Sequence, residues 1–282
     1  MMDPRRTPAN DRVIAAHLAL DADGRHIAEG QSAQVCRPVV NLLRRPDGPR
    51  DRQLLLGAEV TIYDDHDGWA FIQATADRYV GYVPTSSLEQ PPEPVTHQVC
   101  TPATHAYSAA DMKSADLCSL SHGSRLRVFS FDGKFAETTQ GYVPLPHLRP
   151  ISQTDRNPVA VAQLFMGTPY LWGGNSRWGI DCSGLVQAAM LACGVDCPGD
   201  SDQQELELGD NIPLGNTAVP TDLQSGDLLF WKGHVALIQD PETMIHANAY
   251  HMAVALEPVA DAIERIMSQG DGPVTGHRRV TL

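Results

Sequence analysis

Short alternations of apolar and polar residues mark the first half of the chain. Between residues 31 and 150 the apolar runs are brief, and Asp-Gly pairs at 67–68 and 132–133 interrupt them. This pattern predicts short antiparallel strands joined by tight turns. Ahead of them, residues 13–20 form one short amphipathic piece. We interpret residues 1–30 as an arm that packs on the body of the protein.

The pattern changes from about residue 151 onwards. Two apolar stretches, 159–165 and 185–192, have the length of short helices. Three later stretches predict strands, at 223–231, 234–238 and 244–248. Helices that precede strands predict an α+β domain over residues 151–282, with a helix packed across one sheet.

The first half of the chain contains an internal repeat. Residues 35–88 and 99–148 both open with Val-Cys-x-Pro, pass through an Asp-Gly turn and close with Gly-Tyr-Val-Pro. Two copies of one small module account for this shared order. Each copy has the pattern of a small antiparallel β-barrel, and the prolines at 91–94 provide a stiff linker between them. We therefore expect modules at 31–90 and 95–150.

A cysteine follows a turn that is rich in glycine and aromatic residues. The turn covers residues 169–181, and Cys182 opens an apolar stretch that predicts a buried helix. Unpaired N–H groups and the positive end of a helix dipole favour a thiolate, so the pKa of this thiol is expected to be lowered. Cysteine is also a common buried small residue, so its position alone does not establish a nucleophile.

A nucleophilic cysteine needs a base, and histidine suits that role. His234 opens one predicted strand, and His246 lies in the next one, twelve residues later. If these strands pair through the Asp-Pro-Glu turn at 240–242, the two side chains can lie side by side. Alternatively, a histidine at a strand end is an ordinary surface group. We interpret the other histidines as surface residues: His17, His26, His66, His97, His105, His122, His147, His251 and His277.

Composition narrows the classes of partner. The chain has 282 residues, a net charge of −13 and an isoelectric point near 5.2, which argues against a nucleic acid or an anionic membrane as partner. The N-terminus lacks the apolar core of a secretory signal, and no stretch approaches the roughly 20 apolar residues of a membrane span. We therefore expect a soluble, cytoplasmic protein, and we favour a monomer.

The cysteine content argues against a disulfide scaffold. Six cysteines in a chain of this length are too sparse for one, so reduced thiols are expected. Cys193 and Cys197 are close in sequence, but a zinc site needs two further ligands at a matching spacing, and the sequence offers none. We expect neither a metal nor a cofactor.

Six motifs between residues 169 and 247 resemble, in order, the signature of the NlpC/p60 family of cell-wall cysteine peptidases. They are Pro-Tyr-x-Trp-Gly-Gly, Gly-Ile-Asp-Cys-Ser-Gly-Leu-Val, Pro-Gly-Asp-Ser-Asp-Gln-Gln, Gly-Asp-Leu-Leu-Phe-Trp, Gly-His-Val-Ala-Leu and Ile-His-Ala. The resemblance implies a papain-like peptidase core with Cys182 as nucleophile, His234 as general base and His246 as the orienting third member. It also implies that Tyr170 donates to the oxyanion together with the backbone N–H of Cys182.

The two repeated modules are similar to bacterial SH3-like (SH3b) domains. Family members that carry such domains cut the bond between γ-D-glutamate and a diamino acid in stem peptides with a free N-terminal L-alanine. On this resemblance, Asp181, Ser183 and Ser201 surround the N-terminal end of the substrate, where Asp181 pairs with its ammonium group. Glu59 and Tyr79 of the first module are implied to close off the same subsite.

The expected protein is thus a cysteine peptidase acting on murein peptides during cell-wall recycling, with an α+β, papain-like core preceded by two small SH3-like β-barrels. One position departs from the family pattern, because Gly199 stands where an arginine is usual; any role of that arginine is absent or supplied from elsewhere. Two alternatives stay open. One is an amidase or acyltransferase that acts on another amide, and the other is a wall-binding protein with a vestigial peptidase core.

Overall fold

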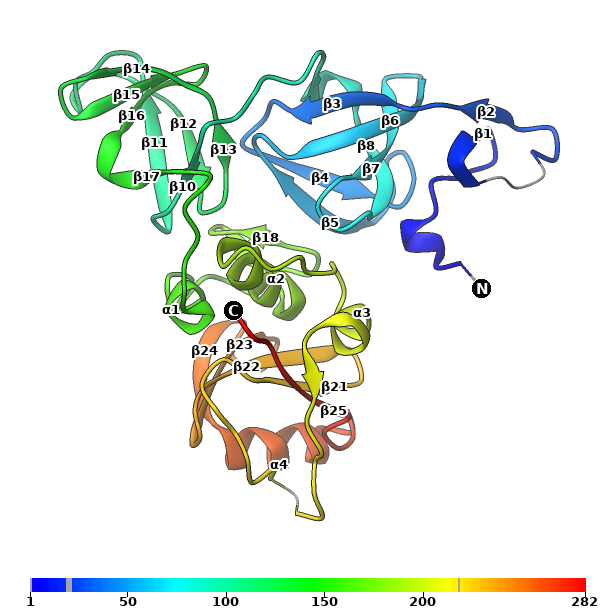
Figure 1. Cartoon of the computed structure of the whole chain (residues 1–282), viewed down its shortest axis with the longest axis vertical. Helices are drawn as coiled ribbons and strands as arrows, with labels where there is room; N and C mark the ends of the chain where they lie inside the picture. The colour runs from blue at the N-terminus through cyan, green and yellow to red at the C-terminus, as the bar shows by residue number, and fades with distance from the viewer. Residues whose placement is uncertain (1, 19–21, 218) are drawn as a thin grey trace. The chain divides into compact units, whose positions relative to one another are not determined.

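A computed structural model describes residues 2–18, 22–217 and 219–282 (Figure 1). The chain divides into two compact units, Met1–Gln153 and Thr154–Leu282. None of the helices in the described ranges is long and apolar enough to cross a membrane. All six cysteines lie in the described ranges, and none of them is in a disulfide bond.

The first module of the N-terminal unit is one antiparallel sheet with the strand order β5-β4-β8-β7-β6-β3-β9. Its strands are β3 (Gln31–Val35), β4 (Val39–Leu43), β5 (Arg50–Leu55), β6 (Glu59–His66), β7 (Trp69–Ala74), β8 (Val80–Pro84) and β9 (Leu88–Glu89). Alternate side chains of these strands point inward. Leu42, Val60 and Ile72 are among those that share one buried core.

The second module repeats this arrangement in two smaller sheets, ordered β12-β11-β16-β15-β14 and β13-β10-β17. Its strands are β10 (His97–Val99), β11 (Ala103–Tyr107), β12 (Asp116–Ser121), β13 (Arg125–Leu126), β14 (Val128–Asp132), β15 (Phe135–Thr138), β16 (Gly141–Pro144) and β17 (Leu148–Pro150). The continuous strand β6 corresponds here to β13 and β14, which are separated at Arg127. The Gly-Tyr-Val-Pro motif lies on β8 and β16, and each is followed by a short 3-10 turn.

The two modules also pack directly on each other. Leu56, which follows β5, is buried in the core of the second module. Its carbonyl accepts a hydrogen bond of 2.8 Å from the backbone N–H of Arg125. Gly57 has a φ of +79°, and a β-carbon there would collide with the carbonyl oxygen of Arg125. Only glycine meets both demands, so this junction is fixed by backbone contact as well as by apolar burial.

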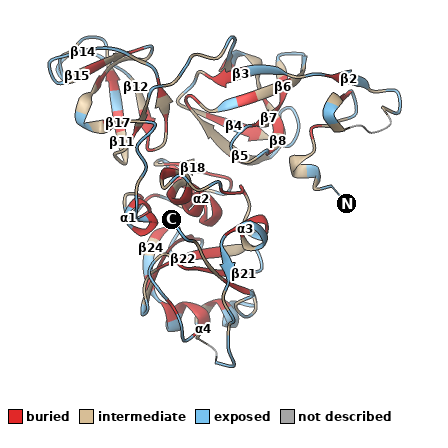
Figure 2. Cartoon of the chain, in the orientation of Figure 1, coloured by how far each residue is buried: buried red, intermediate tan, exposed pale blue. Residues whose placement is uncertain are grey.

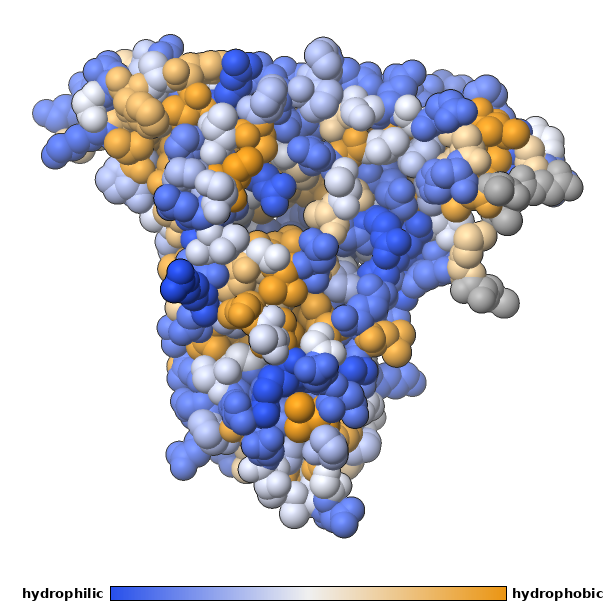
Figure 3. All heavy atoms as spheres, viewed as in Figure 1, coloured by the Kyte–Doolittle hydropathy of each residue, from blue (hydrophilic) through white to orange (hydrophobic). Residues whose placement is uncertain are grey.

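The outer surface of the second module carries exposed apolar side chains. Leu117, Phe129 and Phe131 are among them, and apolar surface gathers over this module in Figure 3. Phe129 and Phe131 lie on β14, which is an edge strand of the five-stranded sheet.

The N-terminal residues pack against the first module. β1 (Val13–Ala15) pairs in parallel with β2 (His26–Ala28), and Val13 and Ala28 share a buried cluster with Phe71 of β7. The side chain of Asn10 donates a 2.9 Å hydrogen bond to the hydroxyl of Tyr82. Residues 19 and 20, the end of the predicted amphipathic piece, lie outside the described residues.

The C-terminal unit is built on a six-stranded antiparallel sheet with the order β20-β25-β21-β22-β23-β24. The strands are β20 (Asp210–Asn211), β21 (Leu228–Trp231), β22 (His234–Asp240), β23 (Thr243–Asn248), β24 (Ala253–Pro258) and β25 (Gly276–Arg279). Its helices are α1 (Pro158–Gln163), α2 (Cys182–Ala192), α3 (Ser201–Glu207) and α4 (Val259–Gln269), and a two-stranded hairpin of β18 (Asn175–Ser176) and β19 (Gly179–Ile180) precedes α2.

Helices cover both faces of this sheet (Figures 1 and 2). Val235, Leu237 and Ile245 face the buried side of α1 and α2, in one core. The intervening residues Ala236 and Ile238 face α4, in a second core. The prediction of a helix across one sheet is met by α2, and α4 adds a layer that the apolar pattern did not indicate.

Candidate active site

Cys182 is the first residue of α2, and Asp181 is the N-cap of that helix. The cysteine side chain is buried. The backbone N–H groups of Val235, Ser183 and Cys182 itself lie near enough to favour a negative charge on its sulfur. Val235 directly follows His234 in β22. The thiol therefore lies against the start of the strand that His234 opens.

The predicted lowering of the thiol pKa is wrong. Burial raises the pKa of Cys182 to about 12, and the negative charge of Asp181 adds to this effect. The backbone N–H groups around the sulfur act in the opposite direction but are outweighed. The loss of solvation on burial costs the thiolate more than the helix terminus can return. The resting residue is a neutral thiol.

The carboxylate of Asp181 caps α2 from inside the protein. One oxygen accepts from the backbone N–H of Gly184 at 2.7 Å and from the hydroxyl of Ser183 at 3.1 Å. The other accepts from the backbone N–H of Gly173 at 2.8 Å. Three of about four lone-pair positions are thus occupied by the protein itself. Asp181 is a structural cap first, and the predicted contact with a substrate ammonium stays a prediction.

Backbone atoms pack without intervening side chains where the loop meets the first turn of α2. A β-carbon on Gly184 would lie 2.5 Å from the carbonyl oxygen of Gly174. A β-carbon on Gly174 would lie 2.5 Å from the carbonyl oxygen of Gly179. Real β-carbons do not approach oxygen so closely, so glycine is needed for this seating of the helix.

Two further predicted site residues, Tyr170 and Ser201, belong to segments before and after α2 in the chain. Burial raises the pKa of Tyr170, and negative charge at Cys182 and Asp181 raises it further, so the phenol keeps its proton. Ser201 is the first residue of α3. The amide of Gln204 in the same helix donates 2.9 Å hydrogen bonds to the carbonyls of Ser183 and Pro198. This amide ties α3 to the start of α2.

The two predicted histidines are in direct contact. β22 and β23 form an antiparallel hairpin around residues 241–242, and Nε2 of His234 lies 2.9 Å from Nδ1 of His246. Burial lowers the pKa of His234 to about 3, and it also lowers the pKa of His246. Both rings are therefore neutral near pH 7.

A glutamate that the sequence analysis missed extends this pair. Oε2 of Glu257 lies 3.0 Å from Nε2 of His246, and Arg265 of α4 donates two 2.8 Å hydrogen bonds to the same carboxylate. Burial alone would raise the pKa of Glu257, but the hydrogen bonds from Arg265 and His246 outweigh it and lower the pKa from 4.5 to about 2. Glu257 is ionised beside two neutral imidazoles.

Glu59 and Tyr79 belong to the other compact unit. Tyr79 lies in the core of the first module, with the guanidinium of Arg52 5.9 Å from its ring centroid. Glu59 is exposed at the start of β6. Their predicted part in closing the substrate subsite stays a prediction.

Two histidines that were expected at the surface are buried, so that interpretation is wrong for His122 and His277. Nε2 of His277 lies 2.7 Å from Asp227. No cluster of three or more His, Cys, Asp or Glu side chains that could hold a metal occurs among the described residues.

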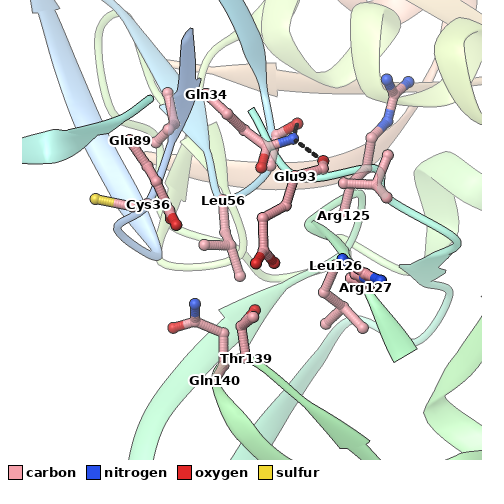
Figure 4. Close-up of a pocket in the computed structure, with 13 residues that line it drawn as sticks. Gln34, Cys36, Leu56, Glu89, Glu93, Arg125, Leu126, Arg127, Thr139 and Gln140 are labelled. Carbon is pink, nitrogen blue, oxygen red and sulfur yellow. Dashed lines mark hydrogen bonds between the residues drawn. The ribbon is translucent and has the colours of Figure 1, made fainter. Parts of the chain in front are cut away.

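The N-terminal unit has a small polar cleft between its two modules (Figure 4). Glu89, Glu93, Arg125 and Arg127 line it, and the amide of Gln34 donates a 3.2 Å hydrogen bond to the carbonyl of Glu93. Charges of both signs meet there. Cys36 also lines the cleft, but none of the lining residues is a histidine that could act as its base. We therefore assign the chemistry to the C-terminal unit.

Comparison with known families agrees with this assignment. Residues 42–88 match the bacterial dipeptidyl-peptidase SH3 domain, and residues 167–266 match the NlpC/P60 family. The first range runs from the end of β4 to the start of β9, and the second covers Cys182, both histidines and Glu257.

Individual relatives have related names. The chain is 39% identical over 92 residues to dipeptidyl-peptidase 6 of Lysinibacillus sphaericus, a match that covers 33% of this chain and 32% of that protein. It is 28% identical over 236 residues to a gamma-D-glutamyl-L-lysine dipeptidyl-peptidase of Bacillus subtilis, covering 75% of this chain and 76% of the relative.

A solved structure has the same fold. The crystal structure of an NlpC/P60 family protein from Bacillus cereus matches with a TM-score of 0.71 at 21% identity, over 88% of this chain and 99% of that one. The chain therefore carries a cysteine-peptidase domain of the NlpC/P60 family, with an SH3 domain of the bacterial dipeptidyl-peptidase type ahead of it.

Proposed function

We propose that this protein hydrolyses the amide bond between γ-D-glutamate and a diamino acid in murein stem peptides with a free N-terminal L-alanine. The observation that carries the proposal is the 2.9 Å contact between His234 and His246. The residue after His234, Val235, shares one buried core with Cys182. The bond proposed here is supported by the name of the Bacillus subtilis relative.

The first half of the reaction starts from a neutral thiol and a neutral imidazole. Nε2 of His234 is engaged by His246, so Nδ1 is the ring nitrogen left to take the thiol proton. As the proton moves, the sulfur of Cys182 attacks the γ-carbonyl carbon of D-glutamate. The oxyanion that forms would accept hydrogen bonds from the Tyr170 phenol and the backbone N–H of Cys182.

The second half releases both products. The protonated His234 gives its proton to the nitrogen of the diamino acid, which leaves as an amine while the dipeptide remains as a thioester on Cys182. Water then attacks the thioester carbonyl with His234 again as base, and the thiol is regenerated.

Specificity for a free amino end is part of the proposal. Among the described residues, three groups donate to the Asp181 carboxylate, which leaves one of about four lone-pair positions for a ligand. Gln204, three residues after Ser201 in α3, donates to the carbonyl of Ser183. We propose that Asp181, Ser183 and Ser201 receive the substrate ammonium, and that Glu59 and Tyr79 of the first module close off the space beyond it.

The architecture we propose has a papain-like peptidase core at 151–282 and a second SH3-like barrel at 95–150. Support for the second barrel comes from its shared strand order with the first module and from its own copy of the Gly-Tyr-Val-Pro motif. We also propose that the protein acts as a monomer in the cytoplasm, on recycled wall fragments. Size-exclusion chromatography and cell fractionation test these two points.

The substrate test uses L-Ala-γ-D-Glu-diaminopimelate, its L-lysine counterpart and the N-acetylated form of each. The purified full chain is incubated with each peptide under reducing conditions, and products are identified by mass spectrometry. We expect L-Ala-γ-D-Glu and the free diamino acid from the unblocked peptides only. Cys182→Ala should abolish cleavage, and Cys193→Ala, which changes a half-buried cysteine of the same unit, should not.

Each other outcome has a distinct meaning. Equal cleavage of the acetylated peptides would remove the free-amine requirement. No cleavage of any peptide would remove the proposed activity in favour of a wall-binding role. Cleavage at another amide, or transfer to an added amine, would identify the amidase or acyltransferase alternative.

A further inference from the structure

A buried ion pair lies behind the two histidines. The carboxylate of Glu257 accepts from Nε and Nη2 of Arg265, each at 2.8 Å, and it contacts Nε2 of His246 at 3.0 Å. The side chain of His246 is fully buried, and those of Glu257 and Arg265 are 10% and 16% exposed. Buried charges persist in proteins when they are paired and hydrogen-bonded, as these are.

His234, His246 and Glu257 form a hydrogen-bonded row, and the positions of its protons follow from the carboxylate end. Glu257 is ionised, so it only accepts hydrogen bonds, and Nε2 of His246 must carry the proton between them. A neutral imidazole has one N–H, so Nδ1 of His246 is then an acceptor. The 2.9 Å contact is therefore a donation from Nε2–H of His234 to Nδ1 of His246. That leaves Nδ1 of His234 without a proton.

The assignment fails without the carboxylate. With a neutral partner in place of Glu257, His246 can instead carry its proton on Nδ1 and donate to Nε2 of His234. His234 would then hold its own proton on Nδ1, the nitrogen that has to accept one from the thiol. A base in this tautomer cannot act in the first step.

We propose that Glu257, held in place and ionised by Arg265, is a positioning residue that fixes the direction of the hydrogen bonds through His246 and so keeps Nδ1 of His234 free of a proton. The inference rests on the proposed function only in taking His234 as the base. Glu257 does not touch the reacting atoms. Its hydrogen bond is to His246, and the charges of Glu257 and Arg265 act on His234 in opposite directions.

The groups around this row come from several elements. His246 projects from β23, Glu257 from β24 and Arg265 from α4. His251 acts on His246, and Asp271 and Tyr250 act on Arg265. The guanidinium also lies 4.5 Å from the centroid of the Tyr250 ring and donates to Gln269, which holds it over the carboxylate.

The test compares Glu257→Gln with Glu264→Gln in the full chain. Glutamine keeps the size of the side chain but offers a donor as well as an acceptor, so both directions of the row become possible. We expect kcat to fall at least about tenfold with little change in KM, by analogy with triads whose orienting carboxylate is replaced. Glu264 is exposed on α4, so Glu264→Gln should leave kcat and KM unchanged.

Two readouts do not require the peptide substrate. Nitrogen-15 chemical shifts of the histidine rings report which nitrogen is protonated, and we expect His234 to carry its proton on Nε2 in the wild type and partly on Nδ1 in Glu257→Gln. The rate of Cys182 alkylation by iodoacetamide should fall in the same variant. If the wild type cleaves no murein peptide but both changes appear, the row stands and only the proposed substrate is lost.

Unchanged histidine shifts and an unchanged alkylation rate in Glu257→Gln would overturn the inference, whatever happens to peptide cleavage. Should that variant fail to fold, Arg265→Lys and Arg265→Met provide a second comparison. Lysine retains a cation beside Glu257, whereas methionine removes it and lets burial raise the pKa of the glutamate. We expect the acid limb of the pH–kcat profile to shift to higher pH in Arg265→Met and to lie close to that of the wild type in Arg265→Lys. Identical profiles in the two variants would count against the proposal.

Discussion

Nε2 of His277 lies 2.7 Å from Oδ2 of Asp227, and both side chains are buried although they are fifty residues apart. Arg279 donates two further hydrogen bonds to the same carboxylate, each at 2.8 Å. Burial raises the pKa of Asp227, but the hydrogen bonds from Arg279 and His277 outweigh it and lower the pKa overall. This carboxylate fastens β25 to the turn before β21.

Asp227→Asn should therefore destabilise the C-terminal unit. The change leaves the partly exposed Arg279 and the buried His277 with a neutral partner, and loss of hydrogen bonds to a charged group costs about 1.5–3 kcal/mol. Urea unfolding measures this loss directly. Asp210→Asn, at an exposed position of β20, should stay within about 0.5 kcal/mol of the wild type. Equal stability of the two variants would mean that the contacts of Asp227 with His277 and Arg279 do not stabilise the C-terminal unit.

The buried His234 should make the folded state sensitive to acid. Burial lowers the pKa of its imidazole from 6.5 to about 3, so the folded protein resists a proton that the unfolded chain binds below 6.5. The free energy of unfolding should then fall by up to about 1.4 kcal/mol per pH unit as the pH drops from 6.5 towards 3. Above 6.5 this contribution is fully present.

Urea midpoints across this pH range give the measurement. His234→Gln removes the titrating group, so its stability should depend less steeply on pH than that of the wild type. His26→Gln, at an exposed position of β2, should keep the wild-type slope. Parallel curves for wild type and His234→Gln would contradict the expected shift.

Cys182 should react as a thiol rather than as a preformed thiolate. Because burial raises its pKa to about 12, the thiolate fraction grows about tenfold per pH unit between about pH 7 and pH 9. The rate of Cys182 alkylation, followed by mass spectrometry, should rise in the same proportion. A rate that is flat across this range would indicate an ion pair with His234 and would exclude the neutral resting state.

Asp181→Asn distinguishes the role of Asp181 as the N-cap of α2 from its predicted role as the anionic partner of the substrate ammonium. Asparagine can still accept from Gly184 but not from both Gly184 and Gly173, so we expect a loss of about 1 kcal/mol in unfolding free energy. If the carboxylate also binds an ammonium, KM for the free tripeptide rises beyond what this loss explains. Asp196→Asn, on the exposed connection after α2, provides the control, and a KM equal to that of the control would leave Asp181 as a cap only.

The sequence was informative where chemistry coincides with a motif. The neighbouring strands of His234 and His246 followed from the two apolar runs and the turn between them, and the structure brings the rings to 2.9 Å. The roles proposed for Cys182 and Tyr170 rest on family resemblance. Their burial, which sets their pKa values, depends on contacts with distant segments that no local pattern records.

Glu257 was missed for a specific physical reason. In β24 the apolar Leu256 is 41% exposed and the charged Glu257 is 8% exposed, the reverse of what hydropathy predicts. Arg265, eight residues later, offsets the cost of burying this carboxylate. The spacing from Glu257 to Arg265 spans a strand end and the first turns of α4, so neither strand nor helix periodicity relates them.

The close contacts at Gly174, Gly179 and Gly184 make the position of the Cys182 sulfur depend on the loop before α2 as well as on the packing of the apolar core. Close main-chain approaches, together with the Asp181 carboxylate, set the position of the first turn of α2 against the loop that precedes it. These contacts join the turn that carries the sulfur to its own loop, and the apolar side chains beneath α2 take no part in them. Such a site tolerates drift in its hydrophobic interior far better than the addition of a single methyl group at any of these three positions.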